Sequence, residues 1–259
     1  MHLLGKARLT FQNSKYWLWR KLNPQSSFGN YYVKIAKDVI RHEGPHKSLG
    51  GHLKDGKFGE QGQKEFQKII RYGITPSDTF VDYGCGTLRV GVHFIKYLEY
   101  GRYWGLDISH DFFEEGKRLI GDELLQSKGP NFRTIDEPNV AAVSAAKPRW
   151  LLSYRVLTHV HPDELGSYVG NILKIIGQSG TAIVVGKCSL NKTFQFSHQG
   201  WAHSLATLCE AVDLLNARLT IDKEKVRPCS VTGRMTKSGV FLITPKVTAA
   251  DLRKGPRPA

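Results

Sequence analysis

The sequence predicts an α/β protein with a doubly wound, mainly parallel sheet, and three observations support this fold class. From Thr79 onward, short apolar runs alternate with segments of helical periodicity. The first run ends in the glycine-rich stretch Asp82-Tyr-Gly-Cys-Gly86, which is typical of a tight turn from a strand into a helix. The second run ends at Asp107, which places an acidic side chain at the carboxyl end of the next strand.

The individual elements follow in chain order from these patterns. A first helix is spaced by Phe66, Ile69 and Ile70 and ended by Gly73. Beyond it, the patterns predict strands at 79–83, 102–107, 131–135, 149–154 and 180–186, and helices at 87–100, 110–121, 162–176 and 200–215. The alternating segments 217–224 and 239–244 are joined by a polar, basic connection and predict a final antiparallel hairpin.

Composition divides the chain of 259 residues into three parts. Residues 1–40 carry seven Lys and Arg before the first acid, Asp38, with Trp and Tyr between them, and we expect a basic helical appendage. Residues 41–246 form the predicted α/β domain, and residues 247–259 are expected to be a basic, disordered tail. Hydrophobic residues make up 41% of the chain, which is enough for a substantial core.

The net charge of +14 favours an anionic partner, which leaves open nucleic acid, an acidic membrane face, or a phosphorylated or carboxylated substrate. The four cysteines form no CxxC pair and no Cys/His cluster, so we predict neither a metal site nor a disulfide framework. No apolar run approaches the roughly 20 residues that span a bilayer. Residues 1–22 also lack the features of a signal peptide, and a cytoplasmic protein is therefore expected.

At the glycine turn the sequence resembles the class I S-adenosylmethionine-dependent methyltransferases. Their first motif, a hydrophobic pair followed by Asp-x-Gly-x-Gly, is matched by Phe80, Val81, Asp82, Gly84 and Gly86, and their ribose-binding acid by Asp107. The stretch from Gly84 to Gly91 and the later Val156-Leu-Thr-His159 resemble a bacterial-type branch of unknown substrate. The resemblance extends loosely from about Gly50 to Pro245. It implies a Rossmann-like, seven-stranded sheet with a C-terminal antiparallel hairpin in a three-layer αβα sandwich, and S-adenosylmethionine as the cofactor.

The same resemblance implies which residues contact the cofactor. Asp82, Gly84 and Gly86 would face its methionine portion, Asp107 its ribose and Ile108 its adenine, and Asp136 would bind the adenine amino group. Cys85, between the two glycines, and Tyr154, at the end of the fourth strand, are assigned to the same site. For Asp136 the alternative is an exposed turn acid before Pro138.

Methyl transfer is an in-line displacement, so the protein must align the acceptor with the methyl group and, for a hydroxyl acceptor, remove a proton. His159 is the candidate base, because it follows the fourth strand where acceptor and cofactor would meet. Alternatively, a histidine at this junction caps a helix or bonds a backbone carbonyl. The predicted function is O- or N-methylation of an unidentified small or anionic acceptor.

Other functions share part of the pattern. A nicotinamide-dependent oxidoreductase shares the turn and the acid, but its third glycine is replaced here by Arg89. A nucleic-acid methyltransferase would explain the charge, yet the Asp/Asn-Pro-Pro-aromatic run of amino-directed enzymes is absent after the fourth strand, so specific nucleic-acid binding is not expected. A non-catalytic nucleotide-binding scaffold stays open as a third alternative.

The N-terminal segment also has a pattern of its own. On a helix, Leu4, Ala7, Phe11, Leu18 and Leu22 share one face with basic residues around it, and Asn23-Pro24 would end the helix. Such a basic amphipathic helix in residues 1–22 could attach the protein peripherally to an anionic membrane. The alternative is that it packs on the catalytic domain or covers the substrate mouth.

Overall fold

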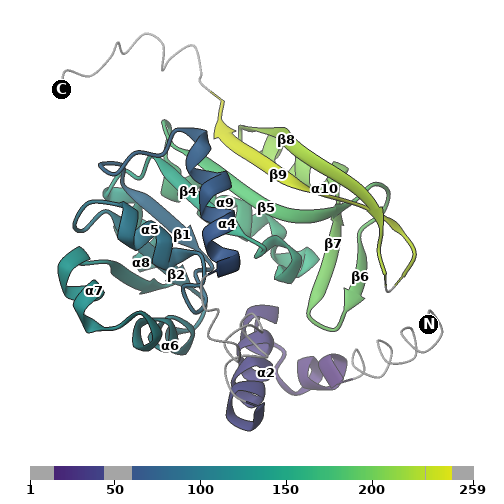
Figure 1. The fold of residues 1–259 in the computed structure, drawn as a ribbon. Helices are drawn as coiled ribbons and strands as arrows, with labels where there is room; N and C mark the ends of the chain where they lie inside the picture. Colours follow the sequence, from purple (N-terminus) through teal and green to yellow (C-terminus); the bar gives the residue numbers. More distant parts are fainter. Residues whose placement is uncertain (1–14, 44–59, 231, 247–259) are drawn as a thin grey trace.

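The computed structural model describes residues 15–43, 60–230 and 232–246, and its centre is a mainly parallel sheet with helices on both faces (Figure 1). The strands of the predicted sheet are β1 (Phe80–Tyr83), β2 (Tyr103–Asp107), β3 (Asn131–Thr134), β4 (Trp150–Tyr154), β5 (Thr181–Ser189), β8 (Ala217–Pro228) and β9 (Met235–Pro245). Their order is β3-β2-β1-β4-β5-β9-β8. β1 to β5 run parallel, whereas β9 runs antiparallel to β5 and β8. The predicted doubly wound, Rossmann-like sheet with a C-terminal hairpin is confirmed.

Successive side chains of each strand point to opposite faces of the sheet and pack into two separate cores. Val81 and Leu151 belong to the core covered by α8, α9 and α10, and Phe80 and Leu152 to the core covered by α4, α5 and α6. These helices are α4 (Glu60–Ile69), α5 (Gly91–Tyr97), α6 (His110–Ile120), α8 (Glu137–Ala145), α9 (Leu165–Ile176) and α10 (Leu205–Leu214). The three-layer αβα sandwich follows from this packing.

The helix predicted for 87–100 is shorter, because the turn before it is longer than expected. α5 begins at Gly91, and both Gly86 (φ 52°) and Leu88 (φ 62°) adopt the left-handed region. Left-handed residues cannot continue an α-helix of L-residues, so the chain completes its turn before the first helical hydrogen bond forms. Leu88 is nevertheless fully buried, which offsets the cost of its backbone conformation.

A second difference lies in the segment 200–215, which was predicted to be one helix. Gly200–Ser204 forms strand β7, and α10 begins only at Leu205, where the Ser204 hydroxyl accepts a bond from the Thr207 N–H. β7 pairs antiparallel with β6 (Phe194–Ser197) and parallel with the last residues of β5. Since β9 occupies the other edge of β5, the β6–β7 hairpin lies on the side of β4, beyond the carboxyl end of that strand. It adds two strands to the predicted seven.

Within residues 60–230, two α-helices were not predicted. α7 (Asp122–Lys128) follows α6, and α8 joins β3 to β4, which are parallel and therefore need a crossover. α8 is rich in alanine and buries only Val140 and Val143, so its apolar stripe is too narrow to predict a helix by periodicity.

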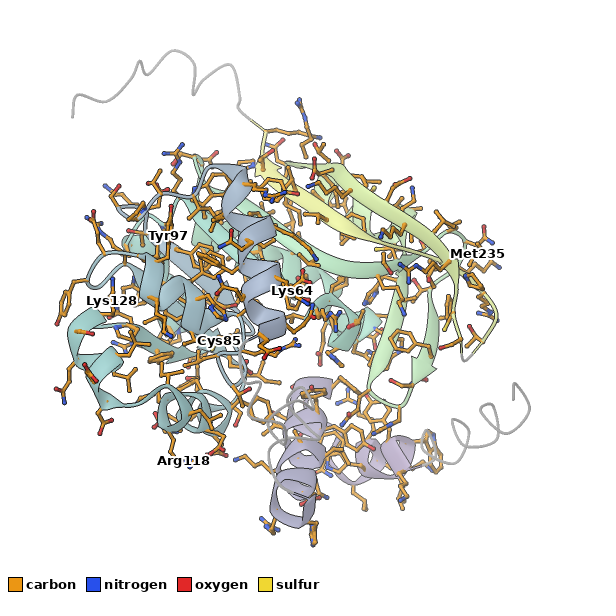
Figure 2. All side chains as sticks on the ribbon, in the orientation of Figure 1. Lys64, Cys85, Tyr97, Arg118, Lys128 and Met235 are labelled. Atoms are coloured by element: carbon orange, nitrogen blue, oxygen red, sulfur yellow. The ribbon has the colours of Figure 1, made fainter. Side chains whose placement is uncertain are left out.

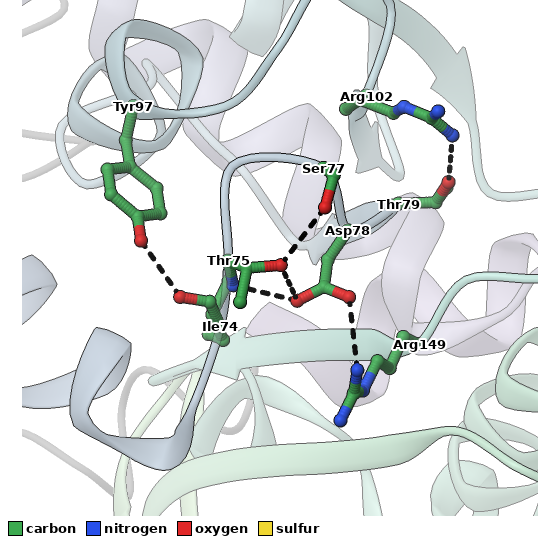
Figure 3. Close-up of polar contacts among 8 residues, drawn as sticks. All are labelled: Ile74, Thr75, Ser77, Asp78, Thr79, Tyr97, Arg102 and Arg149. Carbon is green, nitrogen blue, oxygen red and sulfur yellow. Dashed lines mark hydrogen bonds and ion pairs between the residues drawn. The ribbon is translucent and has the colours of Figure 1, made fainter.

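The amino edge of the sheet, opposite the predicted site, is held by polar contacts around the turn before β1 (Figure 3). The Asp78 carboxylate accepts bonds from the N–H (2.7 Å) and the hydroxyl (2.9 Å) of Thr75, and it forms an ion pair with Arg149 at 3.6 Å. Tyr97 of α5 donates to the Ile74 carbonyl at 3.0 Å. These contacts join the segments that precede β1 and β4, and so fix the relative positions of two strands whose far ends carry the site.

Two helices precede the α/β domain. Residues 15–22 are helical and end before Asn23-Pro24 as predicted, and α2 (Phe28–Glu43) passes the predicted domain boundary at residue 40 within its last turn. Figure 1 shows both helices beside the carboxyl edge of the sheet and close to the β6–β7 hairpin. The first helix packs through Tyr16 and Trp19 on a cluster formed with Phe28, Tyr31 and Trp201.

The predicted membrane-facing stripe is only partly described. Leu18 and Leu22 are 55% and 73% exposed, and Trp17 is 58% exposed, whereas Leu4, Ala7 and Phe11 lie outside the described residues, as does the predicted tail 247–259. Within the described ranges, no helix has both the length and the apolar character needed to cross a membrane. Peripheral attachment therefore stays a prediction.

Candidate functional site

The carboxyl ends of β1, β2 and β4 open into a cavity of about 650 Å³. In doubly wound sheets this edge is where ligands bind, and the volume is typical of small-molecule sites, roughly 300–1,000 Å³. The predicted site residues that line the cavity are Asp82, Gly84, Cys85, Gly86, Asp107, Ile108, Tyr154 and His159. The structure therefore brings together every predicted site residue except Asp136.

The floor of the cavity is the glycine turn after β1, where Cys85 lies between the two glycines (Figure 2). Gly84 has a φ of 83°, and a Cβ atom there would come within 2.2 Å of Val156 Cγ2. Its N–H and that of Cys85 donate to the Leu106 carbonyl of β2, at 2.7 and 3.0 Å. Close approach between this turn and the segment after β4 therefore requires glycine at position 84.

Asp107 is buried beside this turn, and both of its carboxylate oxygens accept backbone bonds. Oδ2 accepts from the Gly86 N–H at 2.7 Å and Oδ1 from the Ile108 N–H at 2.8 Å. Burial raises the pKa of Asp107 to about 6, while the bonds from Gly86 and Ile108 act in the opposite direction. The carboxylate thus holds the turn and the start of the next loop together, and it presents negative charge to the cavity at neutral pH.

Asp82 is the second buried carboxylate of the floor. Its Oδ2 accepts a bond from the Tyr103 hydroxyl at 2.9 Å. Burial raises the pKa of Asp82 to about 7, the bond from Tyr103 lowers it, and the negative charge of Asp107 raises it further. Two acids held close together with raised pKa values favour a cationic ligand, because a positive charge stabilises the ionised form of both.

His159 ends the short helix η3 (Leu157–His159) on the opposite wall of the cavity. Its Nδ1 lies 2.8 Å from the carbonyl oxygen of Gln199, in the turn between β6 and β7. A carbonyl can only accept, so Nδ1 carries the proton and Nε2 is the unprotonated nitrogen of the neutral ring. The side chain keeps an exposed surface, but the protein atoms around the ring desolvate it and lower the pKa of His159, although the bond to Gln199 opposes this. His159 is therefore a neutral base at physiological pH, held in place by the hairpin.

The neighbouring histidines have structural positions. His161 caps η4 (Pro162–Glu164), its Nδ1 accepting from the Asp163 N–H at 3.3 Å. His203 is fully buried in β7, with Nε2 3.0 Å from the Val160 carbonyl. Of the three, only His159 lines the cavity.

Tyr154 and Arg155 leave β4 at the rim of the cavity. Arg155 has a φ of 63°, a conformation that residues other than glycine rarely adopt. Its N–H donates to the Val185 carbonyl at 2.7 Å, and its own carbonyl accepts from the Thr158 hydroxyl at 3.1 Å. Arg89, from the turn after β1, lies over the same Tyr154 ring as Arg155.

The N-terminal segment borders the cavity, as in the alternative that it packs on the catalytic domain or covers the substrate mouth, although the individual lining residues were not predicted. Ser27, Gly29 and Tyr32 line it, and the Tyr32 ring lies 5.1 Å from that of His159. Burial, and secondarily the charge of Asp107, raises the pKa of Tyr32 to about 12. Tyr32 is therefore a neutral phenol placed between the acidic floor and His159. In the sequence, Tyr32 was marked only as one of the aromatic residues of this basic segment.

The two residues assigned to the adenine are placed differently. Ile108 lines the cavity and is 41% exposed, as a residue that flanks a flat ring requires. The Asp136 carboxylate caps α8, accepting from the Asn139 N–H at 2.9 Å, and also from the Thr134 hydroxyl at 2.8 Å. These bonds lower its pKa. Ile135, the residue before Asp136, lines the cavity instead.

The sequence matches no family model and no curated protein, but solved structures share its fold. A geranyl diphosphate methyltransferase in complex with S-adenosylmethionine aligns with a TM-score of 0.55 at 15% identity, over 79% of this chain and 91% of that one. Magnesium protoporphyrin IX methyltransferase from Synechocystis PCC 6803, with S-adenosylmethionine bound, aligns with a TM-score of 0.54 at 14% identity, over 83% and 97% of the two chains.

A third similar structure is the 1,6-didemethyltoxoflavin-N1-methyltransferase of Burkholderia thailandensis, with 1,6-didemethyltoxoflavin and S-adenosylhomocysteine bound. It aligns with a TM-score of 0.53 at 17% identity, over 86% of this chain and 92% of that one. These identities are low, and the three proteins act on unlike acceptors, so the similarity concerns the fold. The chain has the fold of the S-adenosylmethionine-dependent methyltransferases, as the glycine turn and the spaced Asp107 predicted.

Proposed function

We propose that this protein is an S-adenosylmethionine-dependent methyltransferase that methylates an oxygen or nitrogen atom of a small acceptor. One observation carries the proposal: a single cavity combines two buried carboxylates at a glycine turn with a neutral histidine on the facing wall. The solved structures of the same fold, with S-adenosylmethionine or S-adenosylhomocysteine bound, support it.

The floor fits the chemistry of this cofactor. S-adenosylmethionine carries a sulfonium, an ammonium, a carboxylate and two ribose hydroxyls, so it is cationic overall, and when bound it supplies the methyl group. Asp107 would accept hydrogen bonds from the ribose hydroxyls, and Asp82 would contribute negative charge near the methionine portion. Because both carboxyls have raised pKa values, a cationic ligand would draw them into the ionised form as it binds. Gly86 leaves room for the ligand to approach the backbone, because a Cβ atom there would have no neighbour within 4 Å, whereas the space at Gly84 is taken by Val156.

His159 would act on the acceptor. As a bond forms between the acceptor oxygen or nitrogen and the methyl carbon, the bond from that carbon to sulfur breaks, and S-adenosylhomocysteine leaves. The proton lost by the acceptor would pass to Nε2 of His159, and from there to solvent. The Gln199 carbonyl would stabilise the imidazolium formed in this step, because the bond from Nδ1 strengthens when the ring becomes positive.

The tests are cofactor binding first and turnover second. Titration calorimetry should show binding of S-adenosylmethionine and S-adenosylhomocysteine but not of NAD. An activity-guided screen of cell extracts with labelled S-adenosylmethionine would then supply an acceptor. A wild-type protein that ignores S-adenosylmethionine, or prefers NAD, would refute the proposal.

With an acceptor in hand, His159→Ala should keep its affinity for the cofactor and lose roughly 10²–10⁴ in turnover, as expected for a lost general base. His161→Ala is the matched control, since it removes a histidine two positions away that caps η4 and does not line the cavity. If His159→Ala turned over at the wild-type rate, His159 would have only a structural role.

A further inference from the structure

We propose that Arg89 and Arg155 form a subsite for an anionic group of the acceptor, so that the substrate carries a carboxylate or a phosphate. This inference rests on the proposed methyl transfer, and it names the class of acceptor. Four features of the molecule support it: the position of both guanidinium groups near the Tyr154 ring, their lack of an acidic partner among the described residues, the backbone conformation of Arg155, and their place relative to His159.

The two guanidinium groups come from separate loops, and each lies near the ring of Tyr154. Arg89 lies in the turn between β1 and α5, Arg155 follows β4, and both line the cavity. Their Cζ atoms lie 5.8 and 5.4 Å from the centre of the Tyr154 ring, respectively. A ring face attracts a cation only weakly, and two positive charges near the same ring repel each other. An anion in the cavity that both side chains line would reduce that repulsion.

Within the described part of the chain, neither arginine forms an ion pair with a carboxylate. The acid whose charge acts on Tyr154 is Glu65 of α4, and its Oε1 accepts bonds from Gln61 at 3.0 Å and from Lys68 at 2.9 Å. Lys68 itself adds positive charge beside Tyr154. Lys64 projects from the same helix (Figure 2). The charge at this rim is therefore positive.

The other acids of the cavity lie elsewhere. Asp82 and Asp107 belong to the floor and bond Tyr103 and the backbone. Glu164 accepts from the Phe28 N–H at the start of α2. The cavity thus has an acidic floor, which suits a cationic cofactor, and a basic rim, which suits an anionic acceptor. Two ligands of opposite charge could bind there side by side.

The backbone of Arg155 supports a functional role. A left-handed conformation at a residue other than glycine is strained, and such residues cluster at ligand sites because the surrounding structure must hold them. Here the bonds to Val185 and Thr158 hold it. Asparagine or glycine would adopt this conformation more easily, so arginine at this position is explained by its side chain rather than by the turn.

The subsite also lies where an acceptor must bind. Arg155 and His159 follow the same strand, and Arg89 belongs to the turn that forms the floor. A guanidinium group presents paired N–H donors that match the two oxygens of a carboxylate or phosphate. An anion held by this pair would orient the rest of the acceptor, with its hydroxyl or amine between His159 and the cofactor.

The test uses simple anions on the full chain saturated with S-adenosylhomocysteine, at low ionic strength. Inorganic phosphate is followed by phosphorus NMR line broadening and acetate by proton saturation transfer, which separates the two anion chemistries. We expect one of them to bind, and the doubly substituted Arg89→Gln, Arg155→Gln protein to bind it at least tenfold more weakly. Arg234→Gln is the matched control, because its guanidinium lies over the Phe194 ring at 5.2 Å, far from the cavity lining.

The outcomes are distinct. Binding of phosphate or acetate that is lost in the double variant and kept in Arg234→Gln supports the subsite. If neither anion binds to the wild type, or if the control loses as much affinity as the double variant, the subsite does not exist. Affinity for S-adenosylhomocysteine is measured in parallel and should stay within twofold in all variants. A loss confined to the double variant would mean that the two arginines bind the carboxylate of the cofactor, and it would overturn the acceptor subsite. Absence of this affinity in the wild type would instead refute the proposed methyl transfer.

Discussion

Replacement of Asp107 by asparagine is the sharpest test of the cofactor site. Asparagine has the same shape, so Asp107→Asn leaves no cavity and removes one charge. In the structure the carboxylate accepts N–H bonds from Gly86 and Ile108, and in the complex it would also accept from the ribose. The amide group of asparagine cannot accept on its nitrogen side. At least one donor is therefore left unpaired in a buried place.

The loss of a charged acceptor costs about 1.5–3 kcal/mol. At 1.4 kcal/mol for each factor of ten, this corresponds to a dissociation constant for S-adenosylmethionine that is weaker by about 10- to 150-fold. Stability should change much less. Burial of the charge already raises the pKa of Asp107 to about 6, so removing the charge offsets part of the cost of the lost bonds. We expect an unfolding temperature within a few degrees of the wild type.

The assay is titration calorimetry with S-adenosylmethionine at pH 8, where Asp107 of the free protein is ionised, with thermal unfolding measured in parallel. Asp136→Asn is the control. It makes the same change in charge at the end of the neighbouring strand, on a carboxylate that caps α8 and does not line the cavity. If Asp107→Asn bound the cofactor as tightly as the wild type, Asp107 would not contact the ribose. If Asp136→Asn lost as much affinity for the cofactor, Asp136 would bind the adenine amino group as well as cap α8.

Two further predictions concern pH and membranes. The pKa values of Asp82 (about 7) and Asp107 (about 6) are raised above their usual range. These groups therefore contribute stability that is greatest at acid pH and is lost as pH rises through their folded-state pKa values. The free energies of unfolding in urea of the wild type and Asp82→Asn should accordingly converge toward acid pH and differ most above pH 7. Affinity for the cationic cofactor should run the opposite way and weaken below about pH 7, and a pH-independent dissociation constant would contradict the acidic floor. If residues 1–22 bind membranes, the full chain should sediment with anionic but not neutral vesicles at low salt, since basic residues near such a surface contribute about 1 kcal/mol each. A variant with alanine at Trp17, Leu18 and Leu22 should then stay in solution, and equal sedimentation of the two proteins would rule out this anchor.

What could be predicted from the sequence is the part of the molecule that depends on local geometry. The turn at Gly84 and Gly86 has to be built from residues that tolerate positive φ, and the acid at the end of β2 lies only 21 positions beyond Gly86. Strand, turn, helix and strand are consecutive, so their order alone places Asp82 and Asp107 at the same edge of the sheet. The fold class, the cofactor turn and most strands therefore followed from pattern and spacing.

The tertiary structure decided the contacts between distant segments. The basic nitrogen of His159 is defined by the Gln199 carbonyl, 40 residues away, on a β6–β7 hairpin that was predicted to be loop and helix. Tyr32 reaches the cavity only because α2 packs against it. Arg89 and Arg155 both lie near the Tyr154 ring because β1 and β4 are neighbours in the sheet although they lie far apart in the chain. Periodicity and turn chemistry describe neighbours in sequence, whereas these pairings depend on which surfaces bury each other, and only the packed fold determines that.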